Sequence, residues 1–311
     1  MRVSIIVPVF NEESTIARLL LSLSRLDYPR RDLEVVIVDG GSQDSTREIV
    51  NRFPFELLVE PKKITDASAR NLGINRSKGD ILAFTDADCV VSRSWLRDLV
   101  RGFDHAKIGG VAGPIVPLET GNLVQKFQAW LPAPNHDADR RPYPYAVTAN
   151  VAYRSEVFRK VGMFDERYPA GSDMDLSLRM QKLSDYSLRF LTGSGVVFHG
   201  NERNFLRLMS RARTYGYGYY FLSRKHPSEL PQIDDRFRDD ALVVPLVARL
   251  VIGIAKGTPS AERLGDFFSI VLFEAMRAFW QISFDYGVTT GKTKKQQPDS
   301  SADAEFESTS G

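Results

Sequence analysis

Two aspartates one residue apart, Asp86 and Asp88, have the residue type and spacing for metal chemistry. They follow the apolar run 81–84, which is typical of a buried strand. In an extended segment both would point to the same side, so one carboxylate can face a nucleotide while the other binds a cation. Hard divalent cations are commonly held by one or two carboxylates together with a diphosphate. Because aspartate is also common in turns, the pair predicts a metal site only together with its surroundings.

The elements around this pair follow from the hydrophobic pattern. Continuous apolar runs at 3–9, 35–38, 55–59 and 81–84 predict strands buried on both faces. Residues with helical spacing lie between the first two runs: Ile16, Leu19, Leu20 and Leu23. Alternating strands and helices predict an α/β fold with a Rossmann-like, mostly parallel central sheet flanked by helices.

Ligands of such sheets bind at the carboxyl ends of the strands, so polar residues placed there are candidate site residues. The pattern gathers the following at or near that edge: Asn11, Glu12, Asp39, Asp86 and Asp88, with Arg70 on a helix predicted over 66–77. Asp39 precedes Gly40 and Gly41, and a turn leading into a helix near Asp44 would present backbone donors to an anion. An ordinary strand-to-helix turn has the same pattern, so both interpretations stay open for Asp39.

Bulk composition narrows the class of protein. The chain has 311 residues with 43% hydrophobic residues, enough for one large domain and an appendage. A formal net charge of +2 argues against a nucleic-acid partner bound through bulk charge. The single cysteine, Cys89, excludes an internal disulfide and fits a reducing compartment. No signal peptide is visible, so we expect a cytoplasmic protein.

Several motifs occur in a fixed order along the chain. They lie at 3–13, 35–46, 67–73 and 79–88, followed by Ala149-Asn150 and the segment 171–179. Together, over about residues 3 to 222, they resemble the family 2 glycosyltransferases of the GT-A fold. The resemblance implies an inverting enzyme that uses a nucleotide-diphosphate sugar donor and Mn²⁺ or Mg²⁺.

The resemblance also implies roles for individual residues. The matching nucleotide-binding positions are Pro8, Asn11, Glu12, Asp39, Arg70 and Asp86. Asp88 matches the metal ligand, and His199, at the end of the apolar run 196–198, matches a late histidine that completes the metal site in many GT-A enzymes. A satisfied core histidine is the alternative for His199. Asn150, Ser172 and Arg211 are expected on the acceptor side.

Asp173 is the expected general base. Gly171 is expected to break regular structure, and Ser172 can cap the helix that follows. Asp173 and Asp175 fall in the first turn of that helix. A helix dipole alone would favour such carboxylates. Inversion at a sugar carbon, however, requires a carboxylate that takes the proton of the attacking hydroxyl. The family usually has Glu-Asp here and Ser172 replaces the Glu; Asp175 is expected to pair with Arg179.

The segment 107–150 is expected to contain a strand and turn near 109–116 and then a long irregular, proline-rich loop near the acceptor. His136 lies in this loop and is expected to be solvent-exposed rather than a metal ligand.

The C-terminal third predicts a membrane-associated appendage. A helix is expected at 204–222, and a basic stripe at and just before it contains Arg203, Arg207 and Arg211. This stripe is suited to a diphosphate or anionic headgroups, and a solvated basic face is the alternative. We expect a glycosyltransferase domain at 1–222, a linker at 223–240, apolar and amphipathic helices at 241–286 and a disordered tail at 287–311. The segment 241–255 is too short to cross the roughly 30 Å hydrocarbon core, and 266–286 is amphipathic. Both favour attachment to the inner face of the cell membrane.

The sequence therefore predicts transfer of a sugar to a glycan or polyprenyl-linked acceptor, without nucleic acid. One alternative is a nucleotidyltransferase that makes nucleotide sugars, although the first strand lacks the Gly-rich, basic loop such enzymes use. The other is a non-catalytic sugar- or lipid-binding relative. The retained Asp86, Asp88 and Asp173 argue against it.

Overall fold

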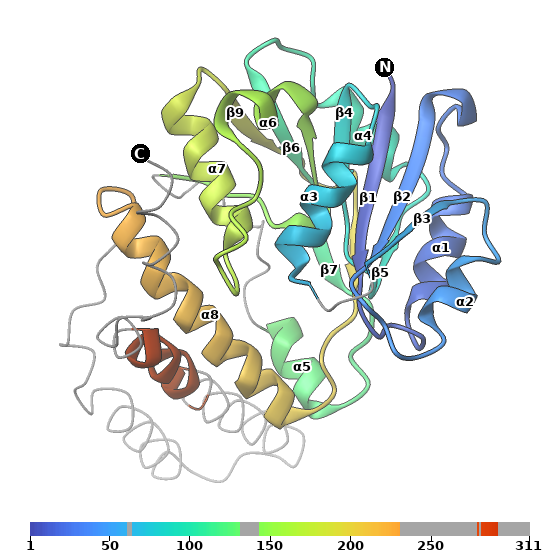
Figure 1. The fold of residues 1–311 in the computed structure, drawn as a ribbon. Helices are drawn as coiled ribbons and strands as arrows, with labels where there is room; N and C mark the ends of the chain where they lie inside the picture. Colours follow the sequence, from blue (N-terminus) through green and yellow to red (C-terminus); the bar gives the residue numbers. More distant parts are fainter. Residues whose placement is uncertain (61–63, 131–142, 231–278, 280, 292–311) are drawn as a thin grey trace, which may run out of the picture. The chain divides into compact units, whose positions relative to one another are not determined.

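The fold is described from a computed structural model of the chain (Figure 1). It describes residues 1–60, 64–130, 143–230, 279 and 281–291. The chain divides into two units, Met1–Arg203 and Asn204–Gly311, and each is described by itself. The apolar segment 241–255, most of the amphipathic segment 266–286, the tail beyond 291 and the loop containing His136 lie outside the described residues.

The first unit is built on a seven-stranded sheet of order β3-β2-β1-β4-β8-β6-β9. Its strands are β1 (Val3–Val9), β2 (Leu33–Asp39), β3 (Glu56–Val59), β4 (Ile81–Phe84), β6 (Ile108–Ala112), β8 (Val151–Arg154) and β9 (Ser187–Phe190). Neighbouring strands are parallel except where β8 pairs antiparallel with β4 and β6. This confirms the predicted mostly parallel α/β sheet.

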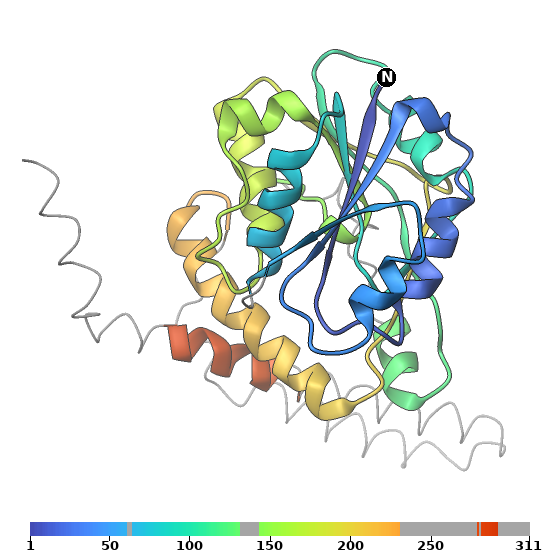
Figure 2. The same ribbon diagram turned by 45° about the vertical axis from the view of Figure 1, so that its right-hand side comes forward.

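Helices cover both faces of this sheet, as Figure 2 shows for α1 and α3. The helices of this unit are α1 (Ile16–Ser24), α2 (Thr46–Val50), α3 (Asp66–Arg76), α4 (Trp95–Arg101), α5 (Leu123–Trp130), α6 (Ser155–Val161) and α7 (Ser172–Leu183). Along β1, Ile5 and Val7 pack with α1 and α4, whereas Ile6 packs with Phe84 and Leu176 on the other face. The continuous apolar runs of the sequence are therefore explained by strands buried on both sides.

A second sheet of order β5-β10-β7 carries the other part of the candidate site. It consists of β5 (Cys89–Val91), β7 (Ile115–Pro117) and β10 (Val197–His199). β10 pairs antiparallel with β5, opposing His199 to Cys89. This pairing brings a residue late in the chain next to the end of the Asp86–Asp88 segment.

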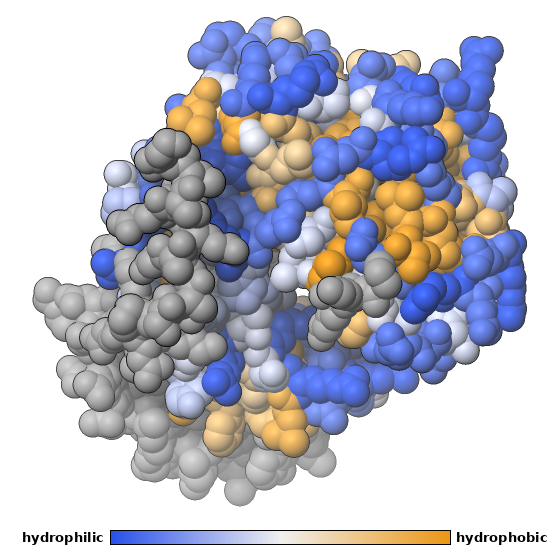
Figure 3. Space-filling model, viewed as in Figure 1, coloured by the Kyte–Doolittle hydropathy of each residue, from blue (hydrophilic) through white to orange (hydrophobic). Residues whose placement is uncertain are grey.

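The edge of the main sheet at β3 is less covered than its centre. Figure 3 shows apolar side chains gathered over β2 and β3. β3 is only half-buried, and Val59 is 44% exposed.

In the second unit, α8 (Phe205–Lys225) packs against a helix over 281–291. A Cβ added at Gly216 would lie 1.8 Å from the carbonyl oxygen of Phe284, so the two backbones approach closely at a glycine.

The helices here differ slightly in extent from the predicted segments. α8 continues to Lys225, into the expected linker, and residues 287–291 are helical where the tail was expected to begin. Gly287 and Gly291 lie directly against α8, where a side chain would not fit. The domain assignments stay predictions. In the part of the chain that the structure describes, no helix combines the length and hydropathy that a membrane-spanning segment requires.

Candidate active site

Asp39 is the last residue of β2 and is fully buried. Its Oδ1 accepts hydrogen bonds from the backbone N–H groups of Gly41 (3.2 Å) and Ser42 (3.0 Å), and Arg47 Nε lies 3.2 Å away. Gly41 has φ +93°, which favours glycine there. Asp39 Oδ2 is buried without a hydrogen-bond partner among the described residues. One carboxylate oxygen thus fixes the turn, while the other can still accept a hydrogen bond.

The loop after β1 is tied to the same turn. Asn11, at φ 55°, donates its backbone N–H to Ser42 Oγ (2.9 Å) and accepts from the N–H of Gln43 through Oδ1 (2.7 Å). Glu12 donates its backbone N–H to Thr46 Oγ1 (2.8 Å). Pro8 is buried within β1 opposite Val38. The predicted nucleotide-binding residues at these strand ends are therefore brought together, with Asn11 linking the two loops.

Arg70 and Asp86 form an ion pair at the end of β4. Arg70 lies on α3 and is 6% exposed, and its Nη2 donates to Asp86 Oδ1 at 2.8 Å. Burial lowers the pKa of Arg70, but the carboxylates of Asp86, Asp66 and Asp173 outweigh this effect and raise it overall. The buried guanidinium is therefore a permanent positive charge at the strand ends.

Asp173 lies in the first turn of α7, close enough to this ion pair for their charges to influence one another. Its Oδ1 accepts from its neighbour Met174 N–H (2.9 Å), and its Oδ2 lies 3.5 Å from the backbone N of Thr148. Burial raises the pKa of Asp173, Arg70 and the backbone donors oppose this shift, and the charge of Asp86 adds to it. A carboxylate with a raised pKa is a stronger base, and its position near Arg70 and Asp86 suits proton abstraction beside a bound donor.

Asp88 immediately precedes β5 and lies beside His199, the last residue of β10. Asp88 Oδ1 lies 3.6 Å from His199 Nε2, and both side chains are 23% exposed. With Cys89 they form a group whose possible ligand atoms lie within 4.8 Å of one another.

The chemistry of these donors fits a divalent cation held by Asp88 and His199. A carboxylate oxygen is a suitable ligand for both Mn²⁺ and Mg²⁺, whereas a neutral imidazole is a better ligand for Mn²⁺ than for Mg²⁺. Cys89 is buried, and its burial, with the charges of Asp86 and Asp88, raises the thiol pKa well above its ordinary value. Its side chain packs in the hydrophobic core of the first unit.

The Asp86–Asp88 segment is not extended, contrary to the geometry expected from the sequence. It forms a turn in which Cys89 N–H donates to Asp86 O at 3.1 Å. In this turn Asp86 pairs with Arg70 and Asp88 lies beside His199, so the two carboxylates have different partners.

Asn150 is placed differently from its predicted role at the acceptor. It is fully buried; its Oδ1 accepts from Trp95 Nε1, and its Nδ2 donates to the carbonyls of Pro114 and Gly195, each at 2.8 Å. These protein contacts occupy its side chain, so in this structure Asn150 braces the segment containing Thr148 rather than presenting its amide to an acceptor.

The other acceptor-side predictions have different outcomes. Ser172 is buried and is the first residue of α7, so it does not cap the helix; Gly171, at φ +88°, holds that position. Arg211 belongs to α8, in the second unit. Asp175 pairs with Arg179 at 2.7 Å as expected and is fully buried.

Sequence reasoning missed two contributors to this site. Asn71, next to Arg70, bonds both backbone groups of Phe164 in the segment before α7. Its place in the motif at 67–73 was the available signal. The backbone N–H of Thr148 has no residue-type signature and could be found only from the fold.

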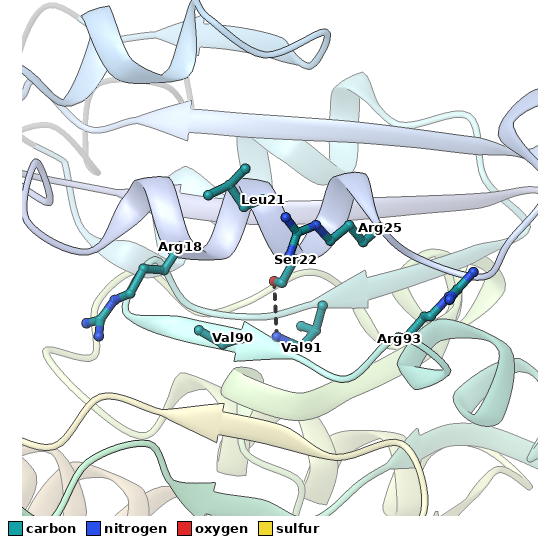
Figure 4. Close-up of a pocket in the computed structure, with 7 residues that line it drawn as sticks. All are labelled: Arg18, Leu21, Ser22, Arg25, Val90, Val91 and Arg93. Atoms are coloured by element: carbon teal, nitrogen blue, oxygen red, sulfur yellow. Dashed lines mark hydrogen bonds between the residues drawn. The ribbon is translucent and has the colours of Figure 1, made fainter.

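A separate surface cavity of about 640 Å³ lies between α1 and β5 (Figure 4). It is lined by Arg18, Leu21, Ser22, Arg25, Val90, Val91 and Arg93. Ser22 Oγ accepts from the backbone N–H of Val91 at 3.2 Å, which covers part of this sheet edge. The predicted site residues do not line it.

The mostly parallel sheet with helices on both faces is a fold of the GT-A type. Residues 4–162 match the family model described as glycosyl transferase family 2, and the chain belongs to that family. It is 32% identical over 196 residues to glycosyltransferase AglE of Haloferax volcanii, covering 60% of this chain and 64% of that one. It is 30% identical over 237 residues to the pre-mycofactocin glycosyltransferase of Mycobacterium tuberculosis, covering 73% and 48%.

A solved structure with the same fold is the mannosyltransferase PcManGT of Pyrobaculum calidifontis in complex with GDP-Man and Mn²⁺. It matches with a TM-score of 0.63 and 20% identity, covering 95% of this chain and 88% of that chain. The likeness supports the fold. The matches to the two curated relatives span about half to two thirds of their lengths.

Proposed function

We propose that this glycosyltransferase moves a sugar, with inversion, from a nucleotide-diphosphate sugar to a hydroxyl of a lipid-linked or cell-surface glycan. The observation that carries the proposal is that Asp173 lies close enough to the Arg70–Asp86 ion pair for the charges of both residues to shift its pKa. A base, a fixed cation and a nucleotide-facing carboxylate are the groups that such a displacement needs.

The nucleotide is assigned to the edge formed by β1 and β2. Asp39 Oδ2, buried and without a partner among the described residues, is suited to accept a hydrogen bond from a base N–H. The loop containing Asn11 and Glu12 borders this position through its bonds to Ser42 and Thr46.

Asp88 and His199 would hold Mn²⁺ or Mg²⁺, which when bound neutralises charge on the diphosphate leaving group. In this scheme Arg70 adds a positive charge on the nucleotide side. Asp86 fixes the Arg70 guanidinium through the 2.8 Å contact.

The bond changes follow from these positions. Asp173 accepts the proton of the acceptor hydroxyl, whose oxygen bonds to the anomeric carbon from the face opposite the diphosphate. The carbon–oxygen bond to the diphosphate breaks, and the nucleoside diphosphate carries away the electron pair. The products are an inverted glycoside and a nucleoside diphosphate. Direct displacement requires no second nucleophile on the protein.

We assign the enzyme to the inner face of the cell membrane, with a polyprenyl-linked acceptor presented there. In the second unit, α8 carries Arg207 and Arg213 exposed and Arg211 half-buried, beside exposed Leu206 and Tyr215. Exposed guanidinium groups beside apolar and tyrosine side chains support binding at an anionic lipid interface.

A panel of nucleotide sugars with Mn²⁺ or Mg²⁺ and lipid-linked acceptors tests this function. Transfer or slow hydrolysis that releases a nucleoside diphosphate, with inverted product, supports it. Pyrophosphate chemistry would instead indicate a nucleotidyltransferase. Binding without turnover across the panel would indicate a non-catalytic relative.

A further inference from the structure

The segment between α6 and α7 leads directly to Asp173, and glycines with positive φ stand near its two ends. Gly162 has φ +82° and Gly171 has φ +88°. Residues other than glycine rarely adopt this backbone conformation, so the direction of the chain at each end depends on these positions. The placement of Asp173 therefore depends on what holds residues 161–171.

Arg179, one to two turns further along α7, binds the start of this segment. Its guanidinium donates to the carbonyls of Val161, Gly162 (3.2 Å) and Met163 (2.7 Å). Its Nε donates to the fully buried Asp175 at 2.7 Å, which fixes the guanidinium plane. Both ends of the segment are thereby tied to the same helix.

Asn71 continues this set of contacts from α3. Its Nδ2 donates to the carbonyl of Phe164 at 2.9 Å and to Glu166 Oε1 at 2.7 Å, and its Oδ1 accepts from Phe164 N–H at 3.0 Å. Asn71 is 8% exposed and follows Arg70, which pairs with Asp86. Helix α3, which carries the buried guanidinium of Arg70, thus also binds the segment that leads to Asp173.

We propose that Arg179 and Asn71 are positioning residues that hold the 161–164 backbone and thereby position Asp173 relative to the Arg70–Asp86 pair. The proposal rests on the proposed function, in which Asp173 is the base. Between them, Arg179 and Asn71 bind the carbonyls of consecutive residues 161–164. Because carbonyls at a loop can be satisfied by water, replacing either side chain is expected to loosen the segment more than the sheet.

The test compares Arg179→Lys and Asn71→Ala with Arg154→Lys. Arg154 is a matched control because it also donates to carbonyls, those of Ile108, Phe103 and His105, at another part of the sheet. We expect kcat to fall about tenfold to a hundredfold in the two positioning variants, with the donor KM within about twofold. Arg154→Lys should lose stability without this selective loss of kcat.

If Arg179 acts on catalysis only through Asp173, its effect on kcat should depend on the presence of Asp173. In an Asp173→Asn background, Arg179→Lys should cost little additional kcat, because residues that act as one unit are non-additive. A full multiplicative loss in that background, or an equal loss of kcat in Arg154→Lys, would overturn the proposal.

Amide hydrogen exchange separates this proposal from the assignment of the base and needs no turnover. The Phe164 amide should lose protection in Asn71→Ala, and the 162–171 amides in Arg179→Lys, but not in Arg154→Lys. Unchanged exchange in both positioning variants would refute the positioning role. Altered exchange together with a fully active Asp173→Asn variant would refute the base assignment instead and leave these contacts as a loop anchor. If Arg179→Lys does not fold, Asn71→Ala carries the same measurements.

Discussion

Arg70 Nη2 lies 2.8 Å from Asp86 Oδ1, and the same guanidinium is the main charge that opposes the raised pKa of Asp173. The buried guanidinium of Arg70 on α3 therefore pairs with Asp86 and stabilises the ionised form of Asp173, two carboxylates from different parts of the chain. This arrangement couples the nucleotide side of the site to the ionisation of the proposed base.

Replacing Arg70 by Gln should move the acid limb of the kcat profile to higher pH. Removing the positive charge disfavours the ionised form of Asp173, so its pKa rises further, and a base must be deprotonated to act. Asp86 and the N–H groups of Thr148 and Met174 remain as its neighbours.

The control for this prediction is Arg76→Gln, on the same helix, whose partner Glu56 is partly exposed on the surface. A profile measured with saturating donor and acceptor should move only for Arg70→Gln. An unmoved limb, or a shift to lower pH, would contradict the coupling.

Asp39→Asn should weaken nucleoside-diphosphate binding while retaining the fold of the turn. An asparagine Oδ1 can still accept from Gly41 and Ser42, whereas the free carboxylate oxygen is replaced by a donor. Losing a hydrogen bond to a charged acceptor corresponds to roughly a tenfold to hundredfold weaker Kd. Calorimetric titration measures this, and an unchanged Kd would remove Asp39 from the nucleotide site.

Asp88→Ala should abolish metal-dependent nucleoside-diphosphate binding, and His199→Gln should weaken it. Both remove a candidate ligand from the pair separated by 3.6 Å. Asp104→Asn, an exposed carboxylate paired with Arg189, is the control. If Asp88→Ala binds as tightly as wild type with Mn²⁺ present, the assignment of Asp88 is wrong.

The full chain should bind anionic vesicles and be released by high salt or alkaline carbonate. Replacing Arg207 and Arg211 by Gln should reduce binding by about tenfold or more, since each basic side chain at the surface contributes roughly 1 kcal/mol. Replacing exposed Arg31 and Arg52 by Gln removes equal charge elsewhere and should have less effect. Release by detergent alone would support a spanning hairpin instead.

The sequence predicted the sheet because its strands are buried on both faces and read as apolar runs. Val3–Val9 and Ile81–Phe84 have the predicted bounds, and α3 ends one residue before its predicted end. The sequence analysis missed α5, because the prolines that follow it led to a loop prediction for the whole segment. Its apolar residues Leu123, Val124, Phe127 and Trp130 do have helical spacing.

Parts of the site could not be read from one sequence for a physical reason. The turn that separates Asp86 from Asp88, and the satisfied amide of Asn150, depend on pairings between distant segments. Local spacing carries no information about such pairings. The placement of His199 beside Asp88 was expected from the family resemblance, and the β5–β10 pairing supplies its structural basis.

The most direct test of the central claim is the chemistry-limited turnover of Asp173→Asn. General-base catalysis contributes about 10²–10⁴-fold, so kcat should fall by about that factor while nucleotide-sugar affinity stays nearly intact. Asp185→Asn, an exposed aspartate beyond the end of α7, should retain wild-type turnover. An Asp173→Asn enzyme that keeps more than about a tenth of wild-type turnover would contradict the assignment, because that loss is smaller than the effect of a base.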